Sequence, residues 1–246
     1  MHRGGRPTVA LVSRAFWPFL IGGGIARYTR ATATLLAGSA DVTVILPDFY
    51  AGRVPLDDPR VPRSVRFEFV PEPDHADPRP FSSLYHAWSA AAYEALCRLY
   101  PDGGPDLVEF NDYTGEGAVS IQAKRSGAPS LSRTRIVVGV HGTDEIHRVL
   151  NGQSLSEPES AALIALERIG LAGADVIFTP GGDVRPTYER YYGPDALAPA
   201  RVVTHPFLKA GAGPLPPPAG GGPLRLIHAG RSTEESSRFR RMCCSR

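Results

Sequence analysis

Three consecutive glycines, Gly22, Gly23 and Gly24, separate an apolar segment at residues 8–13 from a helical pattern that begins at residue 24. Glycine has no side chain, so a ligand can approach the backbone closely. The N-terminus of a helix also presents free N–H groups and a partial positive charge. These residues therefore form a candidate site for a phosphate group or a sugar hydroxyl. The alternative is a plain flexible connection into the helix.

Two other glycine-rich sites compete with this interpretation. A P-loop needs Gly-Lys-Ser/Thr after the glycines, and Ile25-Ala26-Arg27 follows here, so a P-loop is excluded. A dinucleotide-binding loop has a third glycine, which Arg27 replaces, and its turn is shorter than residues 14–21 allow. Asp48, at the end of the second predicted strand, is the one feature that favours NAD(P). NAD(P) binding is therefore the weaker alternative.

His141 directly follows the apolar residues 135–140, and Gly142 after it leaves room for a substrate. A histidine at the end of a buried strand can bind a sugar hydroxyl or transfer a proton, so we predict that His141 is catalytic. The alternative is a structural histidine that caps the next segment. Asp144 and Glu145 fit catalysis or the start of a helix equally well, because acidic side chains favour helix N-termini.

A second polar group, Glu109, Asn111 and Asp112, surrounds the end of the predicted strand at residues 106–110. Polar side chains clustered at a strand end suit the binding of hydroxyl groups, so we expect these three to contact the donor or the acceptor. Helix capping by Asp112 or Thr114 explains the same pattern equally well.

Several common catalytic motifs are absent from the sequence. It contains no H-E-x-x-H, no C-x-x-C, no carboxylate-rich metal loop and no G-x-S-x-G. No metal is therefore expected. His86, His147, His205 and His228 are isolated in the sequence, and each is interpreted as a surface or core residue.

Short, almost fully apolar segments alternate with helical patterns along residues 8–204. Strands of this kind separated by helices predict an α/β fold, with a doubly wound, Rossmann-like parallel sheet covered on both faces. Such sheets bind ligands at the carboxyl ends of their strands. The expected strands are residues 8–13, 42–46, 65–70 (nearer an edge), 106–110, 135–140, 175–179 and 201–204. The expected helices are residues 24–37, 83–100, 115–125, 157–173 and 183–192.

The composition is that of an ordinary globular protein, with 42% hydrophobic and 21% charged residues. The net charge of +2 gives no indication of a nucleic-acid partner. No apolar stretch is long enough to span a membrane. The three cysteines have no disulfide-framework spacing, which fits a reducing compartment. We therefore expect a soluble, cytoplasmic protein.

The composition changes after residue 209. Residues 1–209 are expected to form the Rossmann-like domain, and residues 210–223 contain only Ala, Gly, Pro and one Leu, as in a linker. Within residues 224–246, residues 224–229 resemble the first strand of a further domain, and the rest has no apolar periodicity. A natural disordered tail and a reading frame lost near Ser232 both explain this end. On the second interpretation the chain is truncated before its second domain.

The order of these segments resembles the family-4 retaining glycosyltransferases of the GT-B fold. The matching pieces are SRAFWPFLIGGGIARYTRATATLL, PDLVEFNDYTGEG, TRIVVGVHGTDE, ADVIFTPGGDVRPTYERYYG and LRLIHAGR. The resemblance covers residues 8–231 and implies the N-terminal, acceptor-side domain of an enzyme with two Rossmann-like domains. Such an enzyme transfers a hexosyl group from a nucleotide-diphosphate sugar to a sugar, glycan, lipid or small-molecule acceptor.

The resemblance also implies roles for individual residues. The glycines Gly22–Gly24 would approach the donor diphosphate or the acceptor, and His141 would lie near the transferred sugar. Arg231, in HAGR, would neutralise the diphosphate, which suits a mechanism without metal or cofactor. The paired glutamates that hold the donor in this family have no counterpart before the chain ends, so we expect this chain to be inactive alone.

Two further functions stay open, namely a non-enzymatic sugar- or partner-binding domain and an NAD(P)-dependent oxidoreductase. No Tyr-x-x-x-Lys arrangement supports the oxidoreductase, because lysine occurs only at Lys124 and Lys209. If the partner domain is missing, its cleft face would be exposed. Self-association through Phe16, Trp17, Leu20 and Ile21 is then expected.

Overall fold

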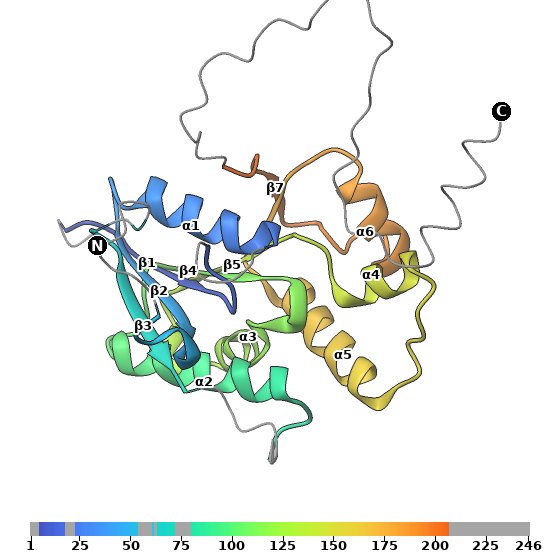
Figure 1. Ribbon diagram of the computed structural model, residues 1–246, viewed down its shortest axis with the longest axis horizontal. Coiled ribbons are helices and arrows are strands. Elements are labelled where there is room, and N and C mark those ends of the chain that lie inside the picture. The colour runs from blue at the N-terminus through green and yellow to red at the C-terminus, as the bar shows by residue number, and fades with distance from the viewer. Residues whose placement is uncertain (1–4, 18–22, 54–60, 62, 72–79, 207–246) are drawn as a thin grey trace, which may run out of the picture. The chain divides into compact units, whose positions relative to one another are not determined.

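The computed structural model describes residues 5–17, 23–53, 61, 63–71 and 80–206. Seven strands form one sheet in the order β3-β2-β1-β4-β5-β6-β7, and all neighbouring strands are parallel (Figure 1). The predicted α/β, doubly wound parallel sheet is confirmed. The strands are β1 (Thr8–Val12), β2 (Asp41–Pro47), β3 (Arg66–Val70), β4 (Leu107–Asn111), β5 (Arg135–Gly139), β6 (Val176–Thr179) and β7 (Ala200–Val202).

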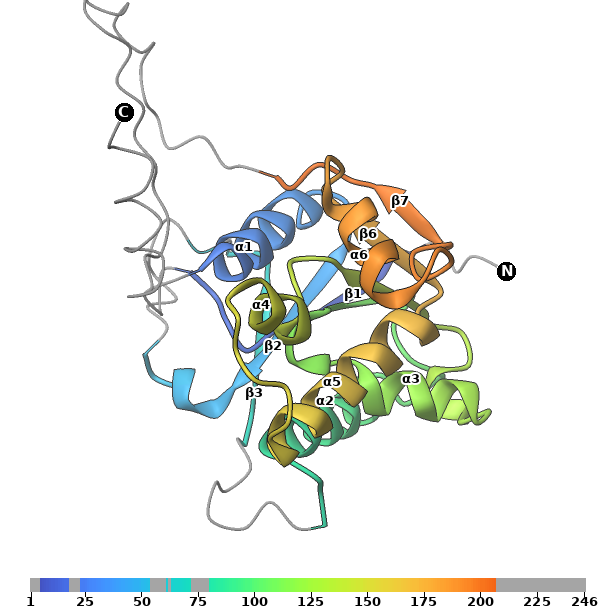
Figure 2. The same cartoon turned by 90° about the vertical axis from the view of Figure 1, so that its right-hand side faces the viewer.

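Helices cover both faces of this sheet. Helix α1 lies over one face, and α2, α3 and α5 pack together over the other (Figures 1 and 2). The α-helices are α1 (Gly24–Leu36), α2 (Leu84–Leu99), α3 (Ala118–Arg125), α4 (Asp144–Leu150), α5 (Pro158–Gly173) and α6 (Val184–Tyr192). The short 3-10 helices are η1 (Asp48–Tyr50), η2 (Tyr113–Gly115) and η3 (Pro129–Leu131).

The central strands are the most apolar because both of their faces are covered. In β2 every residue except Asp41 is buried, and in β5 every residue except Arg135 is buried. The edge strands β3 and β7 are only partly buried, as the sequence predicted for residues 65–70.

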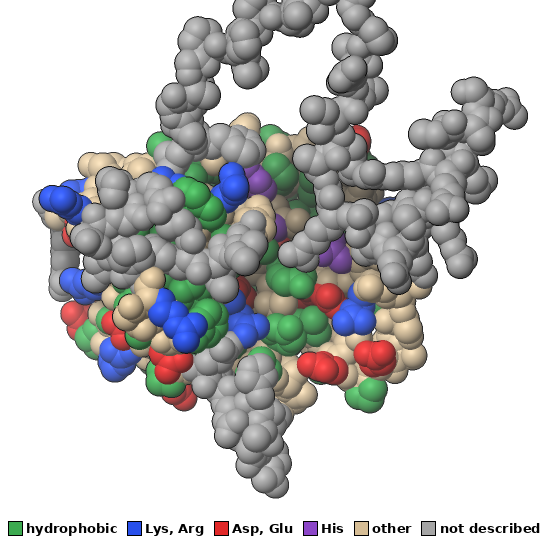
Figure 3. Space-filling view, viewed as in Figure 1, with side chains coloured by type: hydrophobic (Ala, Val, Ile, Leu, Met, Phe, Trp, Pro, Cys, Tyr) green, Lys and Arg blue, Asp and Glu red, His purple; other side chains and the backbone are tan. Residues whose placement is uncertain are grey.

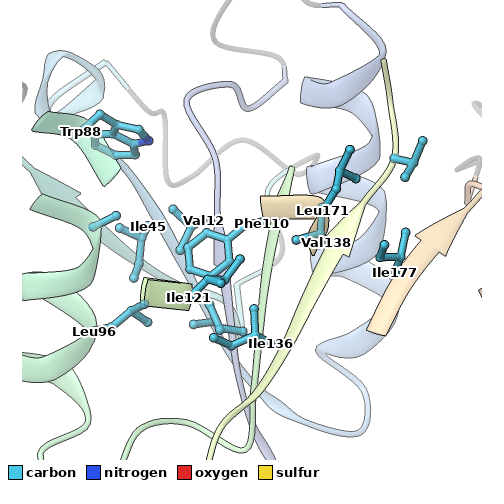
Figure 4. Close-up of a cluster of buried hydrophobic side chains, with 14 of the residues drawn as sticks. Val12, Ile45, Trp88, Leu96, Phe110, Ile121, Ile136, Val138, Leu171 and Ile177 are labelled. Atoms are coloured by element: carbon cyan, nitrogen blue, oxygen red, sulfur yellow. The ribbon is translucent and has the colours of Figure 1, made fainter. Parts of the chain in front are cut away.

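Strand β4 places neighbouring residues on opposite faces of the sheet, since side chains alternate along a strand. Val108 and Phe110 belong to the larger apolar core, together with Trp88 of α2 (Figure 4). Leu107 packs against the second core cluster, on the other face. Glu109 follows the same alternation and lies on the side of α1, so a carboxyl group is held between this helix and the sheet.

Local sequence signals set several helix starts. The Ser83 hydroxyl accepts a hydrogen bond from the His86 amide at 3.2 Å, so Ser83 is the N-cap of α2. Pro158 is the first residue of α5, where its missing N–H is not needed. Helix α4 was not predicted as a separate element. Asp144 and Glu145 form its first turn, after the N-cap Thr143.

Some expectations need correction. Phe16 is fully buried and packs edge-on against Phe67 at 5.2 Å between ring centroids, so it cannot contribute to an exposed apolar face. The last strand spans Ala200–Val202, earlier than the predicted residues 201–204. Leu20, Ile21, the expected linker 210–223 and residues 224–246 lie outside the described residues, so self-association stays a prediction.

Candidate functional site

The predicted polar residues meet at the carboxyl edge of the sheet, after two neighbouring strands. Strands β4 and β5 pair in parallel, with Asn111 opposite Gly139. The segments that leave them, with Asp112 and His141, are therefore adjacent. This is the edge at which parallel α/β sheets bind ligands.

Glu109 is buried beneath α1 and is paired with a residue that the sequence did not single out. The Tyr28 hydroxyl donates a hydrogen bond to Oε1 of Glu109 at 2.5 Å. Burial raises the pKa of Glu109 to about 7, although the hydrogen bond from Tyr28 opposes that shift. Burial, followed by the Glu109 charge, also raises the pKa of Tyr28. The carboxyl group of Glu109 can therefore carry a proton at neutral pH.

His141 lies against the ring of Tyr28, with the ring centroids 4.6 Å apart and the planes at 70°. Burial, followed by the nearby His205, lowers the pKa of His141 to about 3, so its imidazole is neutral at physiological pH. Its Nε2 atom is buried and has no hydrogen-bond partner among the described residues. The residue as a whole is half-buried, and histidine side chains reach the surface on the face drawn in Figure 3.

Gly139 explains how Glu109 and His141 approach each other. A Cβ atom at this position would lie 3.2 Å from Glu109 Oε1 and 3.4 Å from His141 Nε2. The side chains of Glu109 and His141 therefore both occupy the space beside Gly139 that a larger residue would fill. The structure thus brings together the predicted residues Glu109 and His141.

Asp112 supports the site from within. Its carboxylate accepts hydrogen bonds from the amides of His141 at 2.9 Å and Gly142 at 3.3 Å, and from the Tyr188 hydroxyl. The residue is 1% exposed, and burial raises its pKa. We predicted Asp112 as a ligand-binding or capping residue, and its oxygens are engaged by the backbone that carries His141.

Asn111 is also turned inward. Its Nδ2 atom donates to Ser13 Oγ at 3.2 Å and to Glu116 Oε2 at 2.8 Å, while Glu116 Oε1 accepts from the Arg14 amide at 2.8 Å. Burial raises the pKa of Glu116 to about 7. These contacts hold the start of the segment that connects β1 to α1, and Glu116 was missed because a helix-flanking acid normally indicates surface.

Gly23 and Gly24 begin α1. Gly23 is the N-cap, no side chain caps this helix, and its first turn contains no acidic residue. A Cβ atom at either glycine would meet nothing within 4 Å, and neither glycine has a positive φ. The described part of the fold therefore does not require glycine at either position, and both residues are exposed. Gly22 and Arg231 lie outside the described residues.

Glu167 of α5 is a further buried acid that the sequence did not indicate. Its carboxylate accepts hydrogen bonds from the amides of Asp144 at 2.7 Å, Thr114 at 3.0 Å and Glu145 at 3.4 Å. Burial nevertheless raises the pKa of Glu167 to about 8. Glu167 therefore ties η2 and the start of α4 to α5.

Four buried acids with raised pKa values, namely Glu109, Asp112, Glu116 and Glu167, predict that this protein is less stable in alkaline solution. A carboxyl group whose pKa is higher in the folded than in the unfolded state binds more protons when folded. The free energy of unfolding therefore falls as the pH rises from about 5 to about 9. Urea unfolding across this range should show the decline, and Glu167→Gln should flatten it. An equal slope in the variant would contradict the assignment to Glu167.

The described residues contain no group of three or more His, Cys, Asp or Glu side chains that could hold a metal ion. None of the helices in the described part of the chain is long and apolar enough to cross a membrane.

Comparison with known proteins adds the family to this geometry. Residues 23–207 match the family described as "Glycosyl transferase 4-like domain". The chain belongs to this glycosyltransferase family. No curated protein has a significantly similar sequence.

Solved glycosyltransferase structures share the fold of this family member. One is UGT2 of Phytolacca americana complexed with UDP-2fluoro-glucose and pterostilbene, with a TM-score of 0.56, 13% identity and coverage of 83% of this chain and 55% of that one. A UDP-glucosyltransferase from Polygonum tinctorium gives a TM-score of 0.55, 13% identity and coverage of 90% and 55%. The catalytic domain of Starch Synthase IV from Arabidopsis thaliana, bound to ADP and acarbose, gives a TM-score of 0.53 at 13% identity. The match covers 82% of this chain and 52% of that one.

This family member spans about half the length of these structures. The likeness confirms the expected Rossmann-like half of a GT-B fold. At this level of identity it concerns the fold alone.

Proposed function

We propose that this chain is the acceptor-side domain of a glycosyltransferase that moves a hexosyl group from a nucleotide-diphosphate sugar to an acceptor. The observation that carries the proposal is the position of His141 at the carboxyl edge of the sheet, against Tyr28 and next to Glu109, in a chain of this family. The acceptor belongs to the broad class of sugars, glycans, lipids and small molecules. The three cysteines without framework spacing support a reducing, cytoplasmic compartment.

His141 is the residue we propose to contact the transferred sugar. A neutral imidazole can accept a hydrogen bond on one ring nitrogen and donate one from the other, as a sugar hydroxyl requires. Asp112 fixes the backbone of His141, and Tyr28 fixes one side of the ring. These two contacts therefore fix the direction in which the His141 ring points.

The donor diphosphate is proposed to lie near the N-terminus of α1. Gly23 and Gly24 present uncapped amides there, and such amides bind anions. Arg231 would supply positive charge for the departing diphosphate, so the mechanism would need neither metal nor cofactor. The family resemblance implies that a second domain provides most of the donor contacts.

Saturation-transfer NMR with a panel of sugars and nucleotide-diphosphate sugars tests this proposal. We expect weak binding of acceptor-like sugars, a loss of at least about 10-fold in affinity in His141→Ala, and no change in His86→Ala. His86 is the matched control because it lies at the start of α2. Equal binding by wild type and His141→Ala would remove His141 from the site.

Calorimetry with the same donors separates two forms of the proposal. Absence of donor binding by this chain supports an acceptor-side domain that needs its second domain for transfer. Micromolar binding of one donor would instead mean that Gly23, Gly24 and His141 form a donor site of their own. Transfer of the hexosyl group from the donor to an acceptor would distinguish an enzyme from a sugar-binding domain.

A further inference from the structure

Three aromatic rings from three separate elements meet beside Glu109. Tyr28 comes from α1, His141 follows β5, and His205 follows β7. The His205 centroid lies 4.7 Å from that of Tyr28 and 4.8 Å from that of His141. His205 therefore completes a ring cluster around the imidazole of His141.

The ring of His205 packs against the site from the segment that follows β7. The backbone of Val140, the residue immediately before His141, opposes the lowering of the His205 pKa by burial. The planes of the two imidazoles are inclined at 36°, so the His205 ring leans over the His141 ring. One side chain thus contacts both the ring of His141 and the ring of Tyr28.

Besides Tyr28, the titratable groups close to the His141 ring are Glu109, His147 and His205. Glu109 is the nearby carboxyl, and it accepts the Tyr28 hydroxyl. His147 of α4 faces the site across Gly142, where a Cβ atom would lie 2.6 Å from His147 Nε2. The third neighbour, His205, is itself a potential cation, and burial lowers its pKa.

The carboxyl group of Asp112 also lies next to the backbone of His141. It is directed at the amides of His141 and Gly142 and at Tyr188. No carboxylate of the described residues is therefore hydrogen-bonded to the His141 ring.

We infer that His205 is a positioning residue for His141: its ring holds the imidazole of His141 against Tyr28 and keeps it uncharged. This inference rests on the proposed role of His141 in sugar transfer. A fixed, neutral imidazole can present one ring nitrogen to a sugar hydroxyl without first having to reorient. The contact joins residues 64 positions apart, which is why His205 looked isolated in the sequence.

Histidine ring NMR tests the inference without substrate or turnover. The chain has seven histidines, so the ring Cε1–Hε1 signals can be followed one by one, and His141→Gln assigns the signal of interest. In the wild type we expect His141 to stay neutral from about pH 8 down to about pH 5. In His205→Ala its pKa should rise toward the ordinary value of about 6.5, because the covering ring is lost, together with the repulsion that His205 exerts when it is itself protonated.

His205→Phe separates the two contributions of His205. Phenylalanine keeps His141 covered but carries no charge, so the pKa of His141 should rise less than in His205→Ala. If His205→Ala fails to fold, His205→Phe decides alone, and a rise supports the inference. His86→Ala should leave the His141 signal unchanged. A His141 titration that is the same in wild type and in the folded His205 variants would overturn the inference, whether or not the chain binds sugars.

Discussion

Asp112→Ala is expected to lower the free energy of unfolding by about 3–5 kcal/mol, because it leaves several buried donors without an acceptor. The amides of His141 and Gly142 and the Tyr188 hydroxyl all donate to this carboxylate. Such a loss is a large part of the stability of an ordinary domain, which is about 5–15 kcal/mol. The segment that carries His141 should therefore loosen first.

Urea unfolding followed by tryptophan fluorescence measures this loss, since Trp88 is fully buried in the core. Asp195→Ala is the matched control, because Asp195 is exposed, and it should change stability by less than about 0.5 kcal/mol. Asp112→Asn keeps one acceptor oxygen and should fall between the two. A loss in Asp112→Ala no larger than in Asp195→Ala would show that the carboxylate does not hold this segment.

Gly115→Ala should destabilise the protein by a different mechanism, through backbone strain and overlap. Gly115 has φ +64°, and a Cβ atom there would lie 2.6 Å from the Leu166 carbonyl carbon and 2.9 Å from the Glu167 amide nitrogen. A left-handed conformation costs an alanine about 1–2 kcal/mol, and overpacking adds about 1–3 kcal/mol. We expect a total loss of about 2–5 kcal/mol, seen as a fall in Tm of about 10 °C.

Gly152→Ala isolates the backbone part of this effect. Gly152 has nearly the same φ, +65°, but nothing lies within 4 Å of a Cβ atom there. Its loss should be only about 1–2 kcal/mol. If the two variants melt together, the packing of η2 against α5 is looser than the structure has it.

The sheet could be predicted from the sequence because its strands are short, apolar and separated by helices. Strands β2 and β5 are buried almost throughout, and the apolar run VTVIL in β2 indicates this burial from the sequence alone. Helix α4 escaped prediction because its seven residues show no clear apolar periodicity. Its start is set by the N-cap Thr143 and by the hydrogen bonds that Glu167 accepts from the amides of Asp144 and Glu145.

The site was predicted in part. His141 stood out because it directly follows a strand, and Glu109 because it belongs to a polar group near the end of the predicted strand at residues 106–110. The direction of a side chain at such an end is set by packing, so Asp112 and Asn111 could not be recognised as inward-facing. Glu116 and His205 carried no local signal at all, since their contacts join distant parts of the chain.

The alternation within β4 has a consequence for how this protein can vary. Phe110 fills the core on one face, while its neighbour Glu109 reaches Tyr28 on the other. Inserting or deleting one residue within the strand would exchange these two faces, driving the carboxyl into the core and the phenyl ring into the site. Changes of length are therefore expected in the connecting segments and not within β4. The alternation of side chains along this strand places the polar site and the hydrophobic core on opposite faces, so a change of register alters both at once.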